Sequence, residues 1–382
     1  MAETARAAGV EPIDGEELQR GSPFTQRPVL VFWETTKACL LACRHCRAHA
    51  QRDPLPGQLT TEEGERLLRQ IADFGSPSPV VIFTGGDLLM RRDIFQLLDT
   101  AGALGLRCAV APSATPLLDP TALRRLSDAG IHSLSLSLDG PESVHDHIRG
   151  VDGTYRSVIA AMRAAHEAGL SVQINTVVMR STADYLADVA ALLLREGVHV
   201  WEVFFLIATG RALADEYLAP DEWDDVCRFL LDVTRYGLLV RTVEGPFVRR
   251  VLRHRDTDDL PGGPLHRRLQ ERLRVAAGDP VRGVQMPRNG TLDGDGIIFV
   301  GHDGTVTPGG FLPLSLGDVR HDNVVDLYRG HHLLQDIRDR RLNGRCGTCP
   351  LRRVCGGSRA RAYAACGDPL GDDPACAYAP AG

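Results

Sequence analysis

From residue 29 onward, short apolar runs alternate with amphipathic segments, and this alternation limits the folds that the chain can adopt. The apolar runs have the length and composition of strands, and they span Val29–Thr35, Val80–Phe83, Arg107–Pro112, His132–Leu138, Ser171–Val178 and Val198–Leu206. Segments with helical periodicity lie between them, near Thr60–Asp73, Asp93–Leu104, Thr121–Ala129, Tyr155–Ala168 and Ala183–Arg195. Strands that alternate with helices form a parallel sheet with right-handed crossovers. We therefore predict an α/β fold, either a barrel or a doubly wound sheet, with ligands bound beyond the carboxyl ends of the strands.

Three cysteines follow the first of these strands within a single loop. Cys39, Cys43 and Cys46 have CxxxCxxC spacing and come soon after the apolar run Val29–Trp33. Thiolates are soft ligands that bind iron–sulfur clusters, copper(I) or zinc. Because structural zinc and ordinary iron–sulfur sites normally take four protein ligands, three thiolates on one loop can hold a [4Fe–4S] cluster and leave its fourth iron open. The alternatives are a zinc site or three unrelated thiols, although zinc sites usually pair one CxxC with another.

The stretch Cys39-Leu40-Leu41-Ala42-Cys43-Arg44-His45-Cys46 resembles the signature loop of the radical S-adenosylmethionine (SAM) enzymes, with His45 in a place that is usually aromatic. The resemblance implies a partial (β/α)6 TIM-like barrel in which Cys39, Cys43 and Cys46 are the catalytic ligands of a [4Fe–4S] cluster. It also implies that SAM binds the open iron and is cleaved to a 5′-deoxyadenosyl radical, which abstracts hydrogen from the substrate. An oxidoreductase of this kind needs an electron donor such as flavodoxin or ferredoxin.

A glycine-rich motif, Thr84-Gly85-Gly86-Asp87, follows the second predicted strand. Two glycines let the backbone approach a ligand closely, and the Asp87 carboxylate can accept hydrogen bonds from an ammonium group. The motif resembles the GGE motif of the same family, with Asp87 in place of glutamate and Leu88 in place of the usual proline. The resemblance implies that Gly85, Gly86 and Asp87 bind the amino group of SAM. The alternative is a structural turn at the end of a strand.

Polar residues alternate with leucines along the fourth predicted strand. Ser135, Ser137 and Asp139 share one face of this strand, and polar side chains inside a barrel need hydrogen-bond partners. Together with Arg149 they resemble the family pattern SxDG…HDxxRG. The resemblance implies that Ser137 contacts the ribose of SAM and that Arg149 contacts its carboxylate. The alternative for Arg149 is a surface ion pair or a helix cap.

Two positions further along the chain also resemble SAM contacts. Asn175, within the fifth predicted strand, resembles a ribose contact. The strand Trp201–Leu206 leads to Gly210-Arg211 and resembles the part of the family that meets adenine through its backbone. The resemblance adds Asn175 and Arg211 to the cofactor-binding residues, and substrate is the alternative ligand of Arg211. Helical patterns follow at Glu216–Tyr236 and Pro246–Val275.

The end of the chain has the composition of a loop-rich metal-bound unit, because five cysteines lie there: Cys346, Cys349, Cys355, Cys366 and Cys376. This unit resembles the Twitch or SPASM extension of radical SAM enzymes, in the branch that modifies tetrapyrrole side chains in alternative haem and denitrification-haem synthesis. The resemblance implies a second, auxiliary [4Fe–4S] cluster.

A fully ligated auxiliary cluster needs four thiolates, so one of the five cysteines is spare. Cys346, Cys349 and Cys355 are close in sequence. The segment Arg359–Ala365 reads as a short helix that carries Cys366 away, whereas the turn before Cys376 brings the chain back, and the family has its last ligand there. We therefore predict Cys346, Cys349, Cys355 and Cys376 as the ligands.

A predicted hairpin and a predicted helix precede these cysteines. Ile297–Val300 and Thr305–Thr307 flank a turn and form the hairpin, and a helix is expected near Val324–Asp339. A full SPASM domain has a cysteine after the proline of this hairpin. In this chain Gly309-Gly310 follows Pro308, which argues against a second auxiliary cluster.

Composition narrows the partners and the cellular location. A formal net charge of −6 gives no electrostatic reason to expect nucleic acid. The sequence has no apolar stretch of the roughly 20 residues that span a membrane and no secretory signal, so we expect a cytoplasmic protein without a membrane partner. We predict a flexible tail over residues 1–27 with a short helix at Gly15–Arg20, a barrel over 28–236, a bridging region over 237–294, and an auxiliary cluster domain over 295–382.

Three functions remain open at this point. The first is radical chemistry on a small molecule, such as decarboxylation or oxidative loss of a tetrapyrrole propionate side chain. The second is modification of a ribosomally made peptide. Peptide enzymes often carry an N-terminal winged-helix segment, and the roughly 27 residues before the barrel are too few for one, which favours the small molecule. The third, of another class, is a non-catalytic zinc-binding protein.

Overall fold

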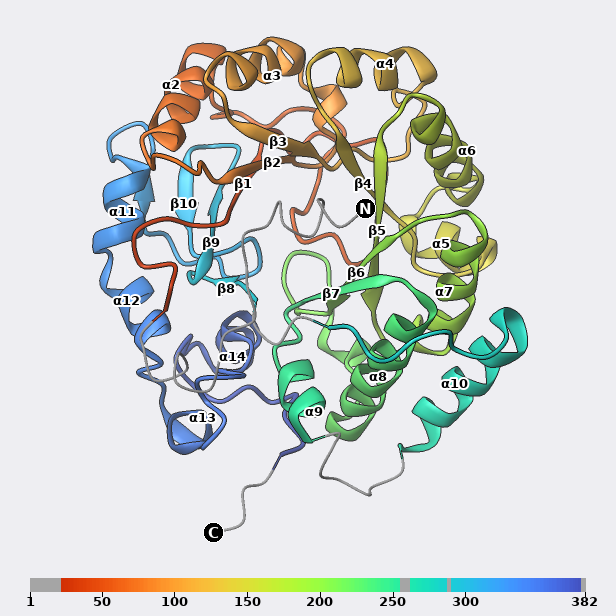
Figure 1. Ribbon diagram of the computed structural model, residues 1–382. Helices are drawn as coiled ribbons and strands as arrows, with labels where there is room; N and C mark the ends of the chain where they lie inside the picture. The colour runs from red at the N-terminus through yellow and green to blue at the C-terminus, as the bar shows by residue number, and fades with distance from the viewer. Residues whose placement is uncertain (1–21, 255–261, 287–289, 379–382) are drawn as a thin grey trace.

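The computed structural model describes residues 22–254, 262–286 and 290–378, and its strands form one curved sheet with helices around the outside (Figure 1). Seven strands follow one another in chain order and pair in parallel. They are β1 (Leu30–Glu34), β2 (Val80–Thr84), β3 (Arg107–Val110), β4 (Ser133–Ser137), β5 (Ser171–Val178), β6 (Val200–Phe205) and β7 (Leu239–Val243). The helices between and after them are α2 (Thr61–Ala72), α3 (Ile94–Ala103), α4 (Pro120–Asp128), α5 (Glu142–Arg149), α6 (Thr154–Glu167), α7 (Leu186–Arg195) and α8 (Pro220–Val233). The predicted parallel α/β fold is confirmed, and β1–β6 are the six predicted strands.

Local sequence signals explain where the helices begin. Before α2, the Thr60 hydroxyl accepts a hydrogen bond from the backbone N–H of Glu63 (3.2 Å), and the Glu63 carboxylate accepts one from the N–H of Thr60 (2.8 Å). Before α4, the Asp119 carboxylate accepts from the N–H of Ala122 (2.7 Å), and Pro120 takes the first helical position. Each cap satisfies backbone donors that have no partner within the helix.

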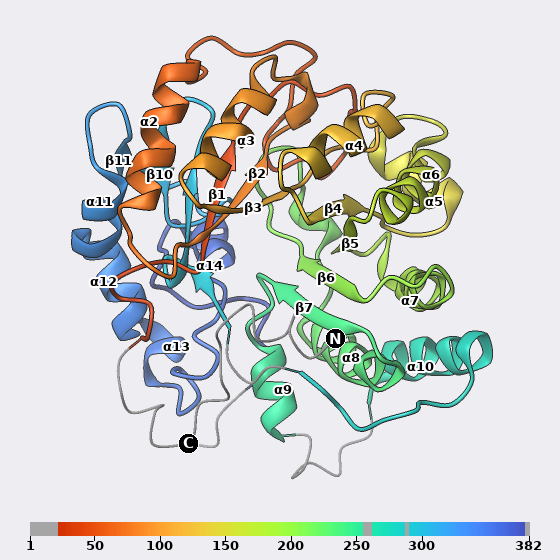
Figure 2. The same cartoon turned by 45° about the horizontal axis from the view of Figure 1, so that its top comes forward.

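Each strand of the barrel has one face in full contact with the helices and a second, half-buried face toward the inside of the curve. In β4, Leu134 and Leu136 are buried, whereas Ser133, Ser135 and Ser137 are half-buried. The same alternation runs through β5 and β6. Figure 2 shows α2, α3, α4 and α7 outside this curve. Residues of the half-buried faces therefore line the barrel interior.

Strand β7 was not predicted, and it lies beyond the boundary at residue 236 that we expected for the barrel. It pairs only with β6 and ends the sheet on that side. Arg241, in its middle, is exposed. Arg241 pairs in register with Glu202 of β6, and its guanidinium donates to Gln173 (3.5 Å), so it belongs to the polar row of β5 and β6. Its charge interrupts the apolar pattern by which a strand is recognised.

Two segments that were each predicted as one helix are two helices. The first, Pro246–Val275, contains α9 (Val248–His254) and α10 (Pro264–Ala277). Gly263 donates from its backbone to the Asp225 carboxylate (2.6 Å), and Pro264 then starts α10. The second, Val324–Asp339, contains α11 (Val324–Gly330) and α12 (His332–Asp339). His331 between them is extended, and its side chain caps α12.

The C-terminal unit continues the sheet of the barrel. Its strands are β8 (Leu292–Asp293), β9 (Gly296–Val300), β10 (Thr305–Thr307) and β11 (Gly317–Asp318), and its last helices are α13 (Gly344–Thr348) and α14 (Arg359–Cys366). Strand β9 pairs in parallel with β1, and β10 pairs with β9 as the predicted antiparallel hairpin. The division of the chain into domains remains a prediction, because the sheet runs through the expected boundary.

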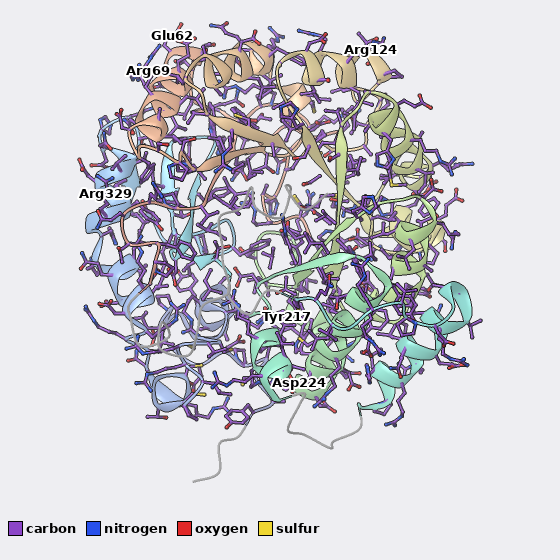
Figure 3. The ribbon with its side chains drawn as sticks, viewed as in Figure 1. Glu62, Arg69, Arg124, Tyr217, Asp224 and Arg329 are labelled. Atoms are coloured by element: carbon purple, nitrogen blue, oxygen red, sulfur yellow. The ribbon has the colours of Figure 1, made fainter. Side chains whose placement is uncertain are left out.

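The described part of the expected N-terminal tail, residues 22–27, is held by hydrogen bonds to the C-terminal unit. The Tyr328 hydroxyl donates to the carbonyl of Phe24 (2.7 Å), and Arg329, labelled in Figure 3, donates to that of Gln26 (2.9 Å). These two hydrogen bonds attach residues 22–27 to the C-terminal unit, and the flexible tail over residues 1–27 stays a prediction. The expected helix at 15–20 lies outside the described residues. Among the helices that the structure describes, none is long and apolar enough to cross a bilayer.

Candidate functional site

The loop after β1 brings Cys39, Cys43 and Cys46 together at the carboxyl end of the sheet. Cys39 and Cys43 are buried and Cys46 is half-buried. Each sulfur has a nitrogen donor beside it. The N–H of Leu41 donates to Cys39 Sγ (3.4 Å), and that of Ala50 donates to Cys46 Sγ (3.4 Å). Donors to the sulfurs are a feature of protein iron–sulfur sites, because they stabilise the bound thiolates.

The third sulfur is served by a side chain rather than the backbone. Arg149 Nη1 lies 3.8 Å from Cys43 Sγ. The same guanidinium forms a buried ion pair with Asp139, at 2.7 Å from Nη2 and 2.8 Å from Nε to Oδ2. Burial is the largest influence and works to raise the pKa of Asp139, but Arg149, two neighbouring histidines and the N–H of Val177 together outweigh it, and the pKa lies below its usual value. Arg149 was expected to meet the SAM carboxylate, and its partner Asp139 was not anticipated.

The three thiols have the donor chemistry that an iron–sulfur cluster requires, because each thiolate of a [4Fe–4S] cluster binds its own iron. Burial raises the pKa of Cys39 and Cys43, so metal binding there is coupled to proton release. In the described part of the chain no three Cys, His, Asp or Glu side chains converge as ligands of one ion.

Arg211 binds the cysteine loop through the backbone carbonyls of the loop. Its Nε donates to the carbonyl of Cys43 (2.8 Å) and its Nη1 to that of Ala50 (3.1 Å), while its backbone N–H donates to the carbonyl of Cys46 (3.0 Å). Gly210 precedes it with φ +61°, and a Cβ there would lie 2.3 Å from the Cys46 oxygen. The buried Nη2 of Arg211 has no hydrogen-bond partner among the described residues. Arg211 was expected to contact the cofactor, and its observed contacts are with the loop itself.

The Gly85-Gly86-Asp87 turn packs directly on the segment that leads to Cys39. A Cβ on Gly85, whose φ is +156°, would lie 2.5 Å from the Thr36 oxygen, and one on Gly86 would lie 2.4 Å from the Ala38 oxygen. The glycines were expected for the approach of a ligand, and the observed close approach is to the chain's own backbone. The turn is therefore tied to the cysteine loop.

The Asp87 carboxylate is fully buried beneath this turn. One oxygen accepts from the Thr115 hydroxyl (2.8 Å) and the other from the N–H of Leu89 (3.2 Å). Burial raises the pKa of this carboxyl, and the two hydrogen bonds oppose the rise. The expected contact with the SAM amino group stays a prediction.

A row of polar residues crosses the barrel interior beside this loop. The parallel register places Ser137 of β4 next to Asn175 of β5, and Asn175 next to Glu202 of β6. Gln173 Nε2 donates to both Asn175 Oδ1 and Glu202 Oε2, each at 2.9 Å. Burial raises the pKa of Glu202. Ser137 and Asn175 were predicted site residues, whereas Gln173 and Glu202 were missed because an isolated polar residue inside a strand gives no sequence signal.

A second cysteine site lies between the end of the chain and α9. A small cavity there is lined by the four predicted auxiliary ligands, Cys346, Cys349, Cys355 and Cys376. Burial raises the pKa of Cys355 to about 12. Cys366 lies at the end of α14, exposed, and its thiol donates to the carbonyl of Ala362 (3.2 Å). The four sulfurs lining one cavity have the donor set that a fully ligated cluster requires.

The hairpin position where a further cluster ligand would stand has no room for a side chain. A Cβ on Gly309 would lie 1.8 Å from Asp293 Oδ1. Asp293 is hydrogen-bonded to the buried carboxyl of Glu244, which in turn accepts from the Ser358 hydroxyl. The carboxyl pair Glu244 and Asp293 therefore fills the space beside Gly309 of the hairpin. One auxiliary cluster rather than two stays a prediction.

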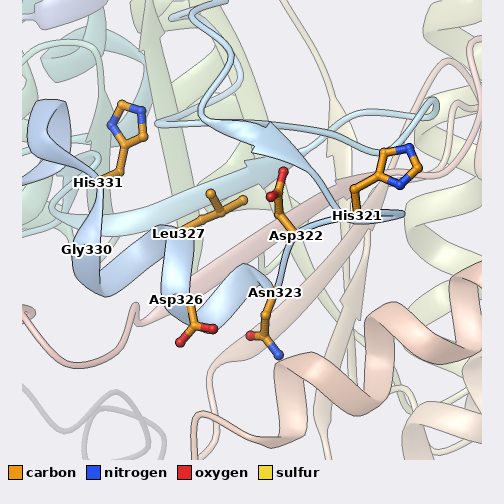
Figure 4. A pocket seen from close by; sticks show the side chains of 7 residues that line it. All are labelled: His321, Asp322, Asn323, Asp326, Leu327, Gly330 and His331. Atoms are coloured by element: carbon orange, nitrogen blue, oxygen red, sulfur yellow. The ribbon is translucent and has the colours of Figure 1, made fainter.

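One further pocket lies on the surface at the start of α11, shown in Figure 4. Its lining residues are His321, Asp322, Asn323, Asp326, Leu327, Gly330 and His331. None of the predicted site residues is among them.

Known proteins share these features along nearly the whole chain. A model of the radical SAM superfamily matches residues 33–193, which include the first cysteine loop. The AdoMet-dependent heme synthase of Nitratidesulfovibrio vulgaris is 34% identical over 368 residues, covering 95% of this chain and 95% of that protein. The protein of the same name from Oleidesulfovibrio alaskensis is 33% identical over 369 residues, covering 95% of this chain and 90% of that protein.

A solved structure extends the likeness to the fold. The crystal structure of Streptococcus suis SuiB bound to precursor peptide SuiA superposes with a TM-score of 0.67 at 17% identity. The superposition covers 92% of this chain and 76% of SuiB. The two chains therefore share a fold that includes the C-terminal unit.

Proposed function

The chain belongs to the radical SAM superfamily, and from this premise we propose that it converts a propionate side chain of a tetrapyrrole by oxidative decarboxylation. One observation carries the proposal. The likeness to an AdoMet-dependent heme synthase extends over 95% of both chains, so it includes the auxiliary unit as well as the barrel. The name of that relative states a haem product, and haem differs from its propionate-bearing precursors in its side chains.

The radical SAM enzyme uses SAM and a [4Fe–4S] cluster, which supply a 5′-deoxyadenosyl radical that abstracts a hydrogen atom from the substrate. In this proposal Cys39, Cys43 and Cys46 hold that cluster. Leu41 and Ala50 donate to two of the sulfurs, and Arg211 fixes the loop that carries all three. Rigid positioning matters because a loosely held radical precursor is open to side reactions.

The polar row inside the barrel is proposed to bind SAM beside the cysteine loop. Ser137 and Asn175 offer a hydroxyl and an amide to the ribose, and Gly85, Gly86 and Asp87 form the turn for the amino group. Arg149, next to Cys43, is proposed to attract the SAM carboxylate, with Asp139 holding its guanidinium in place. Arg211, with one unpartnered buried nitrogen, completes the proposed cofactor-binding residues.

Cys346, Cys349, Cys355 and Cys376 are proposed to hold the auxiliary cluster. Four protein thiolates leave no open iron, which favours electron transfer or structural support over direct binding of substrate. Electrons for SAM cleavage are proposed to come from a small redox protein such as flavodoxin or ferredoxin.

Product analysis tests the proposal. Anaerobically reconstituted, reduced protein is expected to cleave SAM to 5′-deoxyadenosine, and changing Cys39, Cys43 or Cys46 to Ala is expected to abolish cleavage. With a propionate-bearing tetrapyrrole, tested with and without bound iron, mass spectrometry is expected to show a vinyl group in place of a propionate, with loss of one CO2 and two hydrogen atoms. One hydrogen atom passes to 5′-deoxyadenosine, and the other leaves as a proton whose electron goes to an electron acceptor, for which the oxidised form of the small redox protein serves. Cleavage that persists in the cysteine variants would contradict the assignment of Cys39, Cys43 and Cys46 to the cluster. A tetrapyrrole recovered unchanged while SAM is consumed would contradict the proposed substrate.

A ribosomally made peptide is the second candidate substrate, and the SuiB complex is the observation that favours it. That likeness is in fold alone, at 17% identity. The two candidates separate in one experiment, because isotope-labelled substrate hydrogen must appear in 5′-deoxyadenosine only with the true substrate. Iron and zinc analysis of the same sample addresses the zinc-protein alternative, for which stoichiometric zinc without iron is required.

A further inference from the structure

Three arginines surround the auxiliary cysteine site. Arg359 Nη2 lies 3.8 Å from Cys346 Sγ. Arg250 lines the same cavity as the four cysteines. Arg249, its neighbour on α9, interacts electrostatically with Cys355. Arg359 and Arg250 thus adjoin the cysteines, and Arg249 precedes Arg250 on α9, so positive charge lies beside the cavity.

These guanidinium groups are held in place by other parts of the fold. Arg359 donates to the carbonyls of Pro369 (3.2 Å) and Gly371 (2.7 Å). Arg250 forms an ion pair with Asp224 of α8, a residue labelled in Figure 3. Arg249 donates to the carbonyl of Thr291 (3.3 Å). In the described residues no carboxylate forms an ion pair with Arg249; the Asp295 carboxylate, which is paired with Arg340, acts on it, and burial lowers the pKa of Arg249 to about 10.

Carboxylates adjoin both cysteine sites. At the first site Asp87 and Asp139 act on Cys39 and Cys43, where Arg149 is paired with Asp139 and Arg211 holds the loop. At the auxiliary site Asp373 lines the cavity and acts on Cys355 and Cys376, and it is paired with Arg361. Arg359, which lies 3.8 Å from Cys346 Sγ, forms no ion pair with a carboxylate among the described residues, so the auxiliary site keeps a positive charge that no ion pair neutralises.

Reduction adds an electron to a cluster that is already negative, and a fixed positive charge nearby stabilises the reduced form. The reduction potential of an iron–sulfur cluster depends on net charge, hydrogen bonds to sulfur and exposure to solvent. We propose that Arg249, Arg250 and Arg359 raise the reduction potential of the auxiliary cluster. This inference rests on the proposed function, because it requires a cluster at Cys346, Cys349, Cys355 and Cys376.

Arg249 gives the sharpest test, because its charge has no carboxylate partner to be left unpaired when it is removed. The measurement uses full-length protein in which Cys39, Cys43 and Cys46 are Ala, so that only the auxiliary cluster contributes. Iron content is determined first. The reduction potential of the cluster is then measured by a potentiometric redox titration that is followed by EPR. Arg249→Gln is expected to shift the reduction equilibrium at least tenfold toward the oxidised form, about 59 mV for one electron. Arg249→Lys keeps the charge and is expected to stay near the parent.

Two further variants complete the design. Arg359→Gln is expected to shift the reduction potential in the same direction. It replaces Arg249→Gln as the test variant if Arg249→Gln does not fold. Arg274→Gln is the control, because Arg274 is exposed and paired with Glu271 within α10; its potential is expected to match the parent.

The outcomes separate the inference from the proposed function. A full cluster whose potential is unchanged in both Gln variants would overturn the tuning role and leave the ligand assignment standing. A background protein that binds no iron would overturn the ligand assignment and the tuning together. A shift that Arg249→Lys reproduces in full would show that the shape of the guanidinium, rather than its charge, sets the potential, and would also overturn the proposal.

Discussion

Arg211 Nε donates a 2.8 Å hydrogen bond to the carbonyl oxygen of Cys43, although 168 residues separate the two in the chain. With its bonds to Ala50 and to the carbonyl of Cys46, this contact joins the end of the barrel to the loop that carries the first cysteines. The loop has no helix or strand of its own between Cys39 and Cys46. Its shape therefore depends on such distant partners.

We expect Arg211→Gln to weaken cluster retention at the first site. Each hydrogen bond from a charged donor contributes about 1.5–3 kcal/mol, and glutamine cannot reach both carbonyls. The measurement is iron bound per chain after reconstitution, in a background where the four auxiliary cysteines are Ala. Arg180→Gln is the matched control, since Arg180 also donates to two carbonyls, those of Asp215 and Tyr217, away from any cysteine. Equal iron in both variants would contradict the bracing role.

Asp87→Ala is expected to lower both the free energy of unfolding and the affinity for SAM. The loss of two buried hydrogen bonds costs about 1–3 kcal/mol of stability. A lost charge-assisted bond to the SAM amino group costs about 1.5–3 kcal/mol, or roughly ten- to a hundredfold in affinity. Denaturant unfolding and SAM titration measure the two effects separately. Unchanged SAM affinity in a folded variant would leave Asp87 with only its internal role.

The sheet was predictable because its order follows the chain order. Apolar runs such as Val80–Phe83 and Ser171–Val178 are read locally, and parallel pairing then follows from the helices between them. Strand β7 escaped because Arg241 interrupts its pattern at the edge of the sheet. The pairing of β9 with β1 escaped for a different reason, since roughly the whole barrel lies between them in sequence and no local pattern encodes such a contact.

The cysteines of the site were predictable from spacing, whereas the groups around them were not. CxxxCxxC is a local signal, but the contacts of Arg211 with Cys43 and of Arg149 with Asp139 arise only when the barrel closes. The Gly85-Gly86 turn shows the same limit. The sequence indicates that space is needed there, and only the structure shows that the cysteine loop fills it.

Cys366→Ala and Cys376→Ala are expected to differ in iron content. Cys376 lines the auxiliary cavity with three other cysteines, whereas Cys366 is exposed and outside it. In a background that lacks the three N-terminal cysteines, Cys376→Ala is expected to lose the cluster and Cys366→Ala to keep it. Iron counts and the EPR spectrum of the reduced proteins show which of the two variants has kept the auxiliary cluster. Loss with Cys366→Ala alone would reverse the assignment.

The buried carboxyl pair Glu244 and Asp293 makes the free energy of unfolding fall as pH rises from about 4 to neutral. Burial raises the pKa of both carboxyls, and for Asp293 the neighbouring Glu244 adds to the rise. The folded state therefore holds more protons than the unfolded state above the unfolded pKa of about 4. Where the folded state binds more protons, stability falls as pH rises. The pair is thus best tolerated near pH 4 and costs stability at neutral pH, by about 1.4 kcal/mol for each pKa unit of rise.

Asp293→Asn is therefore expected to raise the melting temperature at pH 7–8 and to have little effect near pH 4. The amide can donate to the Glu244 carboxylate, so the contact survives while one of the two buried charges is removed. Thermal unfolding at a series of pH values measures the difference from the parent protein. Asp326→Asn is the control, because Asp326 is exposed in the surface pocket of Figure 4 and its change should shift no melting curve with pH. A melting temperature for Asp293→Asn that falls below the parent at pH 8 would show that the carboxyl pair stabilises the fold, contrary to this argument.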